Sequence, residues 1–285
     1  MPIHASPQRS YFVCATPRSG STLLCEGLKR TGVAGCPAEY FETLASTGLT
    51  RRPWEYFEGV ENEEIDAALP DESSVNGALL PPPGWSREGY DAYLASVVER
   101  ATTANGVFGA KMMWGYFDDF LTLMRGIPDH AGMSAPQLMH SAFPDLRYVV
   151  VRRERKARQA VSLWKALQTF VWRQERSGGS RSEGPSNDDL LYCFEAIDHL
   201  EGQLHAHEAG WNDYFQQAAI EPLTLVYEEF ASDVEGAVRQ VLEHLDVPVP
   251  EGFSLPREPL SRQADDHSEE WVRRYRDQRA QVRGR

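Results

Sequence analysis

The chain has 285 residues, of which 41% are hydrophobic and 25% are charged. These proportions are typical of globular proteins, and they exclude a collagen-like, largely disordered or disulfide-stapled chain. The formal net charge is −13, from 42 acidic and 29 basic residues. A surface this acidic repels a phosphate backbone, so we expect no nucleic-acid binding.

Short apolar runs that are typical of buried strands alternate along the chain with segments of helical periodicity. In chain order we expect a strand at 11–15, a helix at about 21–30, strands at 107–113 and 147–151, a helix at 156–169, a strand at 223–227 and a helix at about 232–245. Parallel strands need crossover connections and are buried on both faces. The alternation therefore predicts a three-layer α/β fold, in which helices flank a mainly parallel central sheet.

Two stretches interrupt this alternation. Residues 69–86 are rich in Pro, and residues 177–187 are rich in Gly and Ser, so we predict a flexible surface loop at each. We interpret the second loop as a tolerated insertion, and a lid over a site is the alternative. Because the alternation of strands and helices resumes after each loop, we predict a single domain over residues 1–285.

The sequence gives no sign of export, membrane insertion or metal binding. The four cysteines lack C-x-x-C spacing, which is typical of reduced thiols in a cytoplasmic protein. No stretch reaches the roughly 18 apolar residues of a membrane span, and the apolar run near the N-terminus is too short for a signal peptide. His205 and His207 lie in a predicted helix, where residues two apart do not share a face, so we expect no metal.

The loop between the first strand and the first helix, TPRSGST at 16–22, is the most informative segment. A helix N-terminus presents free backbone N–H groups and the positive end of the helix dipole, which suits an oxyanion. Gly20 lets the chain curl close to such a group, Arg18 supplies positive charge, and Ser21 and Thr22 add hydroxyl donors. We predict an anion-binding loop; the alternative is an ordinary helix N-cap, for which Ser21 alone would suffice.

Two known phosphate-binding patterns do not fit this loop. The Walker A motif would need a leading Gly and a Lys before the Ser or Thr, and both are missing. Only three residues separate Cys14 from Arg18, which does not match the tyrosine-phosphatase pattern. The loop is therefore P-loop-like without being a Walker A motif.

A second basic segment follows the strand at 147–151. Residues 152–158 hold five basic side chains and one acid, Glu154, in a protein whose net charge is −13. Positive charge is unfavourable at a helix N-terminus, so an anion bound there would offset this cost. A solvated basic helix start is the alternative.

These two segments together resemble the sulfotransferases that use 3′-phosphoadenosine 5′-phosphosulfate as donor. PRSGST at 17–22 is similar to that superfamily's P-[KR]-[ST]-G-[ST]-[ST] loop. The resemblance implies that the 5′-phosphosulfate is bound by Arg18, Ser19, Gly20, Ser21 and Thr22. It also implies that Arg153 and Ser162, nine positions apart, bind the 3′-phosphate, and that Tyr227 in LVYEEF approaches the adenine.

Within this superfamily the chain is most similar to the bacterial trehalose 2-sulfotransferase family. Matching segments occur in order over most of the chain: RSGSTLL, TGVAG-x-P-x-E-[FY]-F, RQAVSLWKALQT-x-VW and RQAD…SEEWVRRYR. The resemblance implies a P-loop-like fold, no metal and a homodimer. The family's acceptor loop has an acid before the Pro, whereas this chain has Cys36 there. The resemblance therefore does not imply trehalose itself as the acceptor.

Sulfuryl transfer needs a base for the acceptor hydroxyl and positive charge near the bridging oxygen of the donor. The resemblance implies Glu39 of PAEYFE as the base, with Glu42 as the competing acid, and Arg18 suits the second task. The residues that would contact the acceptor are Pro17, Cys36, Glu39, Tyr40, Glu42 and Tyr56. Lys111 lies near the end of a predicted strand, and we assign it no role.

We therefore expect a sulfotransferase that uses 3′-phosphoadenosine 5′-phosphosulfate and releases 3′,5′-bisphosphoadenosine. Its acceptor would be a hydroxyl of a carbohydrate or glycosylated small molecule, such as a sugar or a glycolipid precursor. Two alternatives remain open from the residues alone. The strand–loop–helix at 11–31 would also suit a P-loop small-molecule kinase, and the basic segments would suit a non-catalytic nucleotide-binding module.

Overall fold

The computed structural model describes residues 7–170, 189–256 and 266–284. The chain divides into two compact units that interleave along the sequence. Unit 1 consists of residues 1–50, 80–154 and 207–260, and unit 2 of residues 51–79, 155–206 and 261–285. Each unit has a hydrophobic core of its own.

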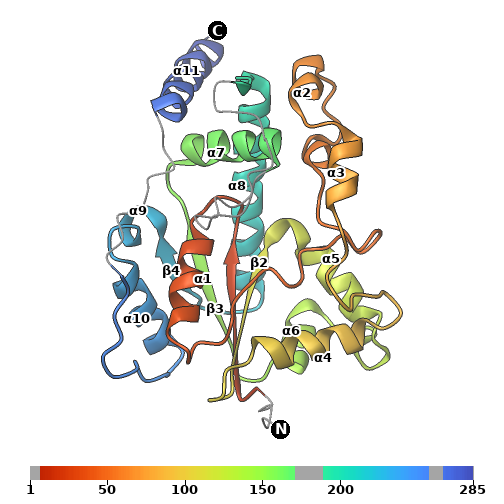
Figure 1. The fold of residues 1–285 in the computed structure, drawn as a ribbon, viewed down its shortest axis with the longest axis vertical. Coiled ribbons are helices and arrows are strands. Elements are labelled where there is room, and N and C mark those ends of the chain that lie inside the picture. The colour runs from red at the N-terminus through yellow and green to blue at the C-terminus, as the bar shows by residue number, and fades with distance from the viewer. Residues whose placement is uncertain (1–6, 171–188, 257–265, 285) are drawn as a thin grey trace. The chain divides into compact units, whose positions relative to one another are not determined.

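Unit 1 is built on a four-stranded sheet with the order β2-β1-β3-β4, in which all neighbouring strands are parallel (Figure 1). The strands are β1 Arg9–Ala15, β2 Val107–Met113, β3 Leu146–Arg152 and β4 Leu223–Val226. Every residue of β2 is buried, as expected for a strand that is covered on both faces. The predicted α/β class with a mainly parallel central sheet is confirmed, and each predicted strand is found at its place in the chain.

Helices cover both faces of this sheet. The helices of unit 1 are α1 Ser21–Arg30, α4 Tyr90–Ala101, α5 Trp114–Arg125, the 3₁₀ helix η2 Pro128–His130, α6 Ala135–Ala142, α9 Tyr227–Phe230, α10 Val234–His244 and the C-terminal part of α8 Phe194–Gln217. On one face, Gly27 of α1 lies against Val238 of α10, so closely that a β-carbon on Gly27 would be 2.8 Å from Val238 Cγ2. On the other face, Trp211 of α8 lies against Phe117 of α5, with ring centroids 5.0 Å apart.

Unit 2 is helical in its described residues. Its elements are the 3₁₀ helix η1 Pro53–Phe57, α2 Glu63–Ala68, α3 Glu72–Ala78, α7 Lys156–Thr169, the N-terminal part of α8, and α11 Asp266–Arg283. Helices α7 and α11 lie against each other. The indole of Trp164 on α7 is fully buried and donates to the carbonyl of Leu191 at 2.8 Å.

The predicted helices at 21–30 and 156–169 have the bounds of α1 and α7, and the helix predicted at about 232–245 corresponds to α10. The stretch 69–86 differs from the prediction of a loop, because it contains α3. Asp71 starts this helix by accepting a hydrogen bond from the Ser73 backbone N–H at 2.9 Å. The loop predicted at 177–187 lies outside the described residues. In the part of the chain that is described, no helix is both long and apolar enough to cross a bilayer.

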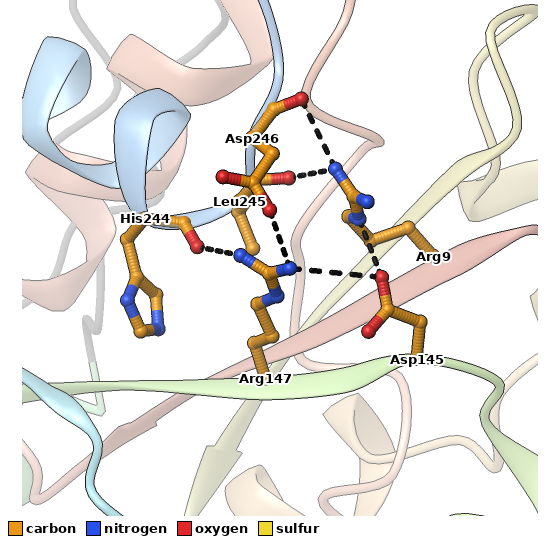
Figure 2. A network of polar contacts seen from close by, with 6 residues as sticks. All are labelled: Arg9, Asp145, Arg147, His244, Leu245 and Asp246. Atoms are coloured by element: carbon orange, nitrogen blue, oxygen red, sulfur yellow. Dashed lines mark hydrogen bonds and ion pairs between the residues drawn. The ribbon is translucent and has the colours of Figure 1, made fainter.

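A polar network at the amino ends of β1 and β3 ties the sheet to the end of α10 (Figure 2). Arg9 donates to Asp145 Oδ2 at 2.7 Å, and Arg147 donates to Asp246 Oδ2 at 2.6 Å. Both guanidinium groups also donate to backbone carbonyls at 244–246. Cationic groups at a helix C-terminus satisfy carbonyls that have no partner within the helix. The network therefore holds α10 against the edge of the sheet that lies opposite the carboxyl ends.

Candidate active site

The carboxyl ends of parallel strands meet at one edge of a sheet, where open α/β folds bind their ligands. Ala15 pairs with Val151, and Arg152 pairs with Val226. The residues that follow these strands, namely the loop at 16–20, Arg153 and Tyr227, therefore come to the same edge. The sheet register thus explains why three segments far apart in the sequence gather at one place.

The loop at 16–20 has an unusual backbone. Arg18 has φ 61° and Gly20 has φ 91°, both in the left-handed region. A left-handed residue other than Gly costs about 1–2 kcal/mol, so the conformation of Arg18 must be held by its surroundings. Gly20 is the N-cap of α1, and no side chain caps the helix there. The alternative of an ordinary side-chain cap does not describe this helix start, and the N-terminal end of α1 stays available to an anion.

Arg153 holds this loop from the neighbouring strand. Its Nη1 donates to the carbonyl of Arg18 at 3.0 Å, and its Cζ lies 4.9 Å from the centroid of the Tyr227 ring. Its Nε lies 4.0 Å from Glu228 Oε1, and Glu228 also accepts from the Glu154 backbone N–H at 3.0 Å. Hydrogen bond, ring contact and ion pair together fix the guanidinium beside the loop.

Positive charge is concentrated here. Burial lowers the pKa of Arg18, and the nearby guanidinium of Arg153 lowers it further. Two partly buried cations repel each other, and an anion bound between or beside them would relieve this repulsion. Ser19 is fully buried, and its hydroxyl has no hydrogen-bond partner among the described residues. A buried hydroxyl without a partner is costly, and an oxyanion at the loop would satisfy it.

The segment at 35–40 runs along β2, which is an edge strand. The Lys111 backbone N–H donates to the carbonyl of Ala38 at 2.9 Å, and the Cys36 N–H donates to the carbonyl of Ala101 at 2.9 Å. Gly35 allows this close approach, because a β-carbon there would lie 2.5 Å from the backbone N of Gly109. These contacts bring Glu39 to the carboxyl half of the sheet.

Glu39 forms an ion pair with Lys111, whose Nζ also donates to Thr22 Oγ1 at 3.1 Å. The Lys111 side chain is 1% exposed, whereas that of Glu39 is 36% exposed. Burial alone would lower the pKa of Lys111, but the carboxylates of Glu39 and Glu42 outweigh it and raise the pKa. Lys111 is therefore an ammonium ion that joins the predicted base to the first turn of α1.

Lys111 received no role from its sequence context, although a signal was present. A charged residue inside the apolar run at 107–113 is unusual in a buried strand and points to a buried partner. What the sequence could not supply was the partner, because Thr22, Glu39 and Lys111 are distant in the chain.

The other residues expected at the acceptor, together with Ser162, which is expected at the 3′-phosphate, fall into two groups. In unit 1, the Tyr40 hydroxyl donates to the carbonyl of Cys36 at 2.6 Å, and burial raises the pKa of Tyr40. Glu42 is buried, unlike Glu39. In unit 2, Tyr56 is buried in the core of that unit, and Ser162 lies on α7. The roles of all these residues remain predictions from the sequence.

One group of side chains in the described part of the chain has the chemistry of metal ligands. Glu64, Cys193 and Glu195 of unit 2 have ligand atoms within 4.8 Å of one another. Both carboxylates are exposed, and burial raises the pKa of the Cys193 thiol, which donates to Glu195 Oε2 at 3.6 Å. Exposed acidic groups are common without a bound ion, so we assign no ion to this group.

The chain is similar in sequence to known sulfotransferases. A family model described as Stf0 sulphotransferase matches residues 10–278. The chain is 34% identical over 278 residues to trehalose 2-sulfotransferase from Mycolicibacterium smegmatis, and 32% identical over 269 residues to the enzyme of the same name from Mycobacterium tuberculosis. Each alignment covers 94% of this chain and 94% of the relative. A solved sulfotransferase from Alicyclobacillus acidocaldarius is 15% identical with a TM-score of 0.44, and the match covers 95% of this chain and 91% of that one.

Proposed function

Because the chain belongs to the Stf0 sulphotransferase family, we propose that it transfers a sulfuryl group from 3′-phosphoadenosine 5′-phosphosulfate to a hydroxyl of a carbohydrate or glycosylated small molecule. One observation carries this proposal within unit 1. The cationic loop of Arg18 and the carboxylate of Glu39 are connected through a single buried side chain, Lys111. An anion site next to an accessible carboxylate suits a reaction that joins an anionic donor to a hydroxyl.

The loop and the residues around it would hold the donor. Arg18, Arg153 and the N-terminal end of α1 supply positive charge, and the buried hydroxyl of Ser19 supplies a donor. Ser162 would join Arg153 at the 3′-phosphate, and Tyr227 would approach the adenine, as the resemblance implies. The ring of Tyr227 lies near Gly20 and Arg153, which supports this role.

Glu39 would act as the general base. As the acceptor oxygen forms its bond to sulfur, the Glu39 carboxylate takes the hydroxyl proton. The bond between sulfur and the bridging oxygen breaks, and its electron pair leaves with 3′,5′-bisphosphoadenosine. Arg18 and the loop N–H groups would stabilise the charge that develops on that oxygen. The 36% exposure of the Glu39 side chain is compatible with approach of an acceptor.

For the acceptor we propose a sugar or a glycolipid precursor. The curated relatives are named trehalose 2-sulfotransferases, which supports a carbohydrate. The resemblance implies an acid in the family's acceptor loop where this chain has Cys36, so a carboxylate that could bind a sugar hydroxyl is missing from that position. We therefore expect the preferred sugar to differ from trehalose. We also propose a homodimer of the single 285-residue enzyme domain, and light scattering would test it.

Incubation with radiolabelled sulfuryl donor and a panel of sugars and glycolipids tests the function directly. We expect label in one carbohydrate and stoichiometric 3′,5′-bisphosphoadenosine, and we expect no turnover of ATP. ATP turnover without sulfuryl transfer would indicate a kinase. Binding of 3′,5′-bisphosphoadenosine, seen as a rise in melting temperature, with no transfer to any acceptor and no effect of Glu39→Gln would indicate a non-catalytic module.

A further inference from the structure

The burial of the charged Lys111 side chain in the sheet needs a physical explanation. It pairs in register with Val13 of β1, so both side chains project from the same face of the sheet, the face that α1 covers. It is among the largest side chains that are almost completely buried. Burying an ammonium ion costs several kcal/mol unless other groups compensate for the lost hydration. The groups around Lys111 therefore indicate what it does.

The ionisable groups that face Lys111 are Glu39, Glu42 and Cys25. Burial raises the pKa of Cys25 to about 12, so this thiol is neutral at physiological pH. Lys29 and Glu26 act on Cys25 from the exposed side of α1, where they form an ion pair of 2.9 Å. At neutral pH, the charges next to the Lys111 ammonium are thus the two carboxylates.

The hydrogen bond to Thr22 has a fixed direction. An ammonium group can only donate, so the Thr22 oxygen must accept from Lys111. A hydroxyl carries a single hydrogen, and that hydrogen is then directed to another acceptor. Thr22 lies in the first turn of α1, next to the loop of Arg18 and Gly20. Lys111 thereby makes Thr22 a donor at the end of the helix that favours anions.

We propose that Lys111 is a positioning residue for the two groups that it contacts, the carboxylate of Glu39 and the hydroxyl of Thr22. It holds Glu39 as an oriented carboxylate, able to accept a proton, and it keeps the Thr22 hydroxyl as a donor to an anion at the loop. This inference rests on the proposed function for the identity of the reaction, but its physical content concerns only Lys111, Glu39 and Thr22.

Lys111→Met keeps the length of the side chain and removes its charge. Two readouts follow the position of Glu39: the chemical shift of its ¹³C-labelled carboxyl signal at neutral pH, assigned by its loss in Glu39→Gln, and kcat with a sugar acceptor. We expect the carboxyl signal to move and kcat to fall about 10- to 100-fold, because a misplaced catalytic group is less effective. Lys29→Met, which removes a partly buried lysine of α1, should change neither.

Thr22→Val tests the other half of the proposal, with Thr22→Ser as its matched control. We expect Thr22→Val to weaken binding of 3′,5′-bisphosphoadenosine by about 12- to 160-fold, the equivalent of one hydrogen bond to a charged group. Thr22→Ser keeps the hydroxyl, so it should bind the nucleotide more tightly than Thr22→Val. The Glu39 signal should stay in place in both variants, because the pair of Lys111 with Glu39 remains.

A folded Lys111→Met protein whose Glu39 signal and kcat match those of the parent would overturn the proposal. A loss of activity without a change in the Glu39 signal would do the same, since it would indicate a purely structural role. If Lys111→Met does not fold, Thr22→Val decides: nucleotide binding like that of the parent would overturn the proposal. The carboxyl signal needs no turnover, so a parent protein without sulfuryl transfer would count against the proposed function and leave the role of Lys111 testable.

Discussion

The ring of Tyr227 lies so close to Gly20 that a β-carbon on Gly20 would come within 2.2 Å of Tyr227 Cδ2. Gly20 also has φ 91°, which other residues rarely adopt. Two independent conditions, backbone conformation and space, thus require glycine at the start of α1. Since Arg153 lies at the same ring, Tyr227 links the loop to the end of β3. We infer that this contact shapes the loop at 16–20 before any ligand binds.

Gly20→Ala should therefore disturb the loop more than its small size suggests. We expect a loss of about 1–3 kcal/mol in the free energy of unfolding, and binding of 3′,5′-bisphosphoadenosine weakened at least about tenfold, equal to about 1.4 kcal/mol. Urea denaturation and calorimetric titration measure the two effects. Gly32→Ala is the matched control, because Gly32 has φ 68° but nothing within 4 Å of its β-carbon position. Equal nucleotide binding by both variants would contradict a special role for the Tyr227 contact.

Arg153→Ala should weaken binding of 3′,5′-bisphosphoadenosine by about 1.5–3 kcal/mol, the scale of a hydrogen bond to a charged group. Arg153→Lys should recover only part of this loss, because an ammonium cannot reproduce the planar guanidinium that contacts both the Arg18 carbonyl and the Tyr227 ring. Calorimetry measures both. Arg152→Ala is the neighbouring control, since Arg152 donates to Asn212 instead. An equal loss in Arg152→Ala would mean that charge in this region matters and not the position of Arg153.

The network at the amino ends of the strands predicts sensitivity to acid. Burial lowers the pKa of His244, and the Arg147 guanidinium lowers it further. The unfolded chain therefore takes up a proton at higher pH than the folded chain, so the free energy of unfolding falls as pH drops through about 6.5. The hydrogen bond from Arg147 also lowers the pKa of Asp246, and its contribution is lost at more acidic pH, as Asp246 becomes protonated in the folded chain.

Urea denaturation at several values between pH 5 and pH 8 measures this dependence. We expect His244→Gln to flatten the curve between about pH 5.5 and 7, because glutamine does not titrate. An identical slope in His244→Gln and the parent would show that other groups cause the acid sensitivity.

The sequence was informative about the sheet and about the loop for a physical reason. Both depend on local patterns: apolar runs form buried strands, and Gly20 with its hydroxyl neighbours marks a helix start near an anion. The parallel order of the strands then brings Arg153 and Tyr227 to the loop without further information. Helix α3 was missed because Pro and Gly around it suggested a loop, whereas Asp71 caps a short helix between them.

The centre of the site could not be predicted in the same way. The role of Lys111 depends on contacts with Glu39 and Thr22, which are 72 and 89 positions away in the chain. Pairing of this kind follows from the three-dimensional arrangement of α1, β2 and the segment at 35–40. A buried lysine in a strand signals that a partner exists, but only the structure identifies it.

Glu39 is the residue on which the proposed reaction most depends. Glu39→Gln keeps the shape of the side chain and removes its ability to accept a proton. We expect turnover with a sugar acceptor to fall about 10²–10⁴-fold, the usual contribution of a general base. Binding of 3′,5′-bisphosphoadenosine should remain close to that of the parent, because Glu39 would contact the acceptor and not the nucleotide. Steady-state kinetics and calorimetry on the same preparation measure the two quantities.

Glu42→Gln is the matched control, since Glu42 also acts on Lys111 but is buried. A buried carboxylate is poorly placed to take a proton from an incoming acceptor, so this change should reduce turnover clearly less than Glu39→Gln. Melting temperatures of both variants should be recorded, because each change removes one of the two carboxylates that balance the charge of Lys111. Full activity in Glu39→Gln together with a large loss in a folded Glu42→Gln protein would transfer the role of base to Glu42.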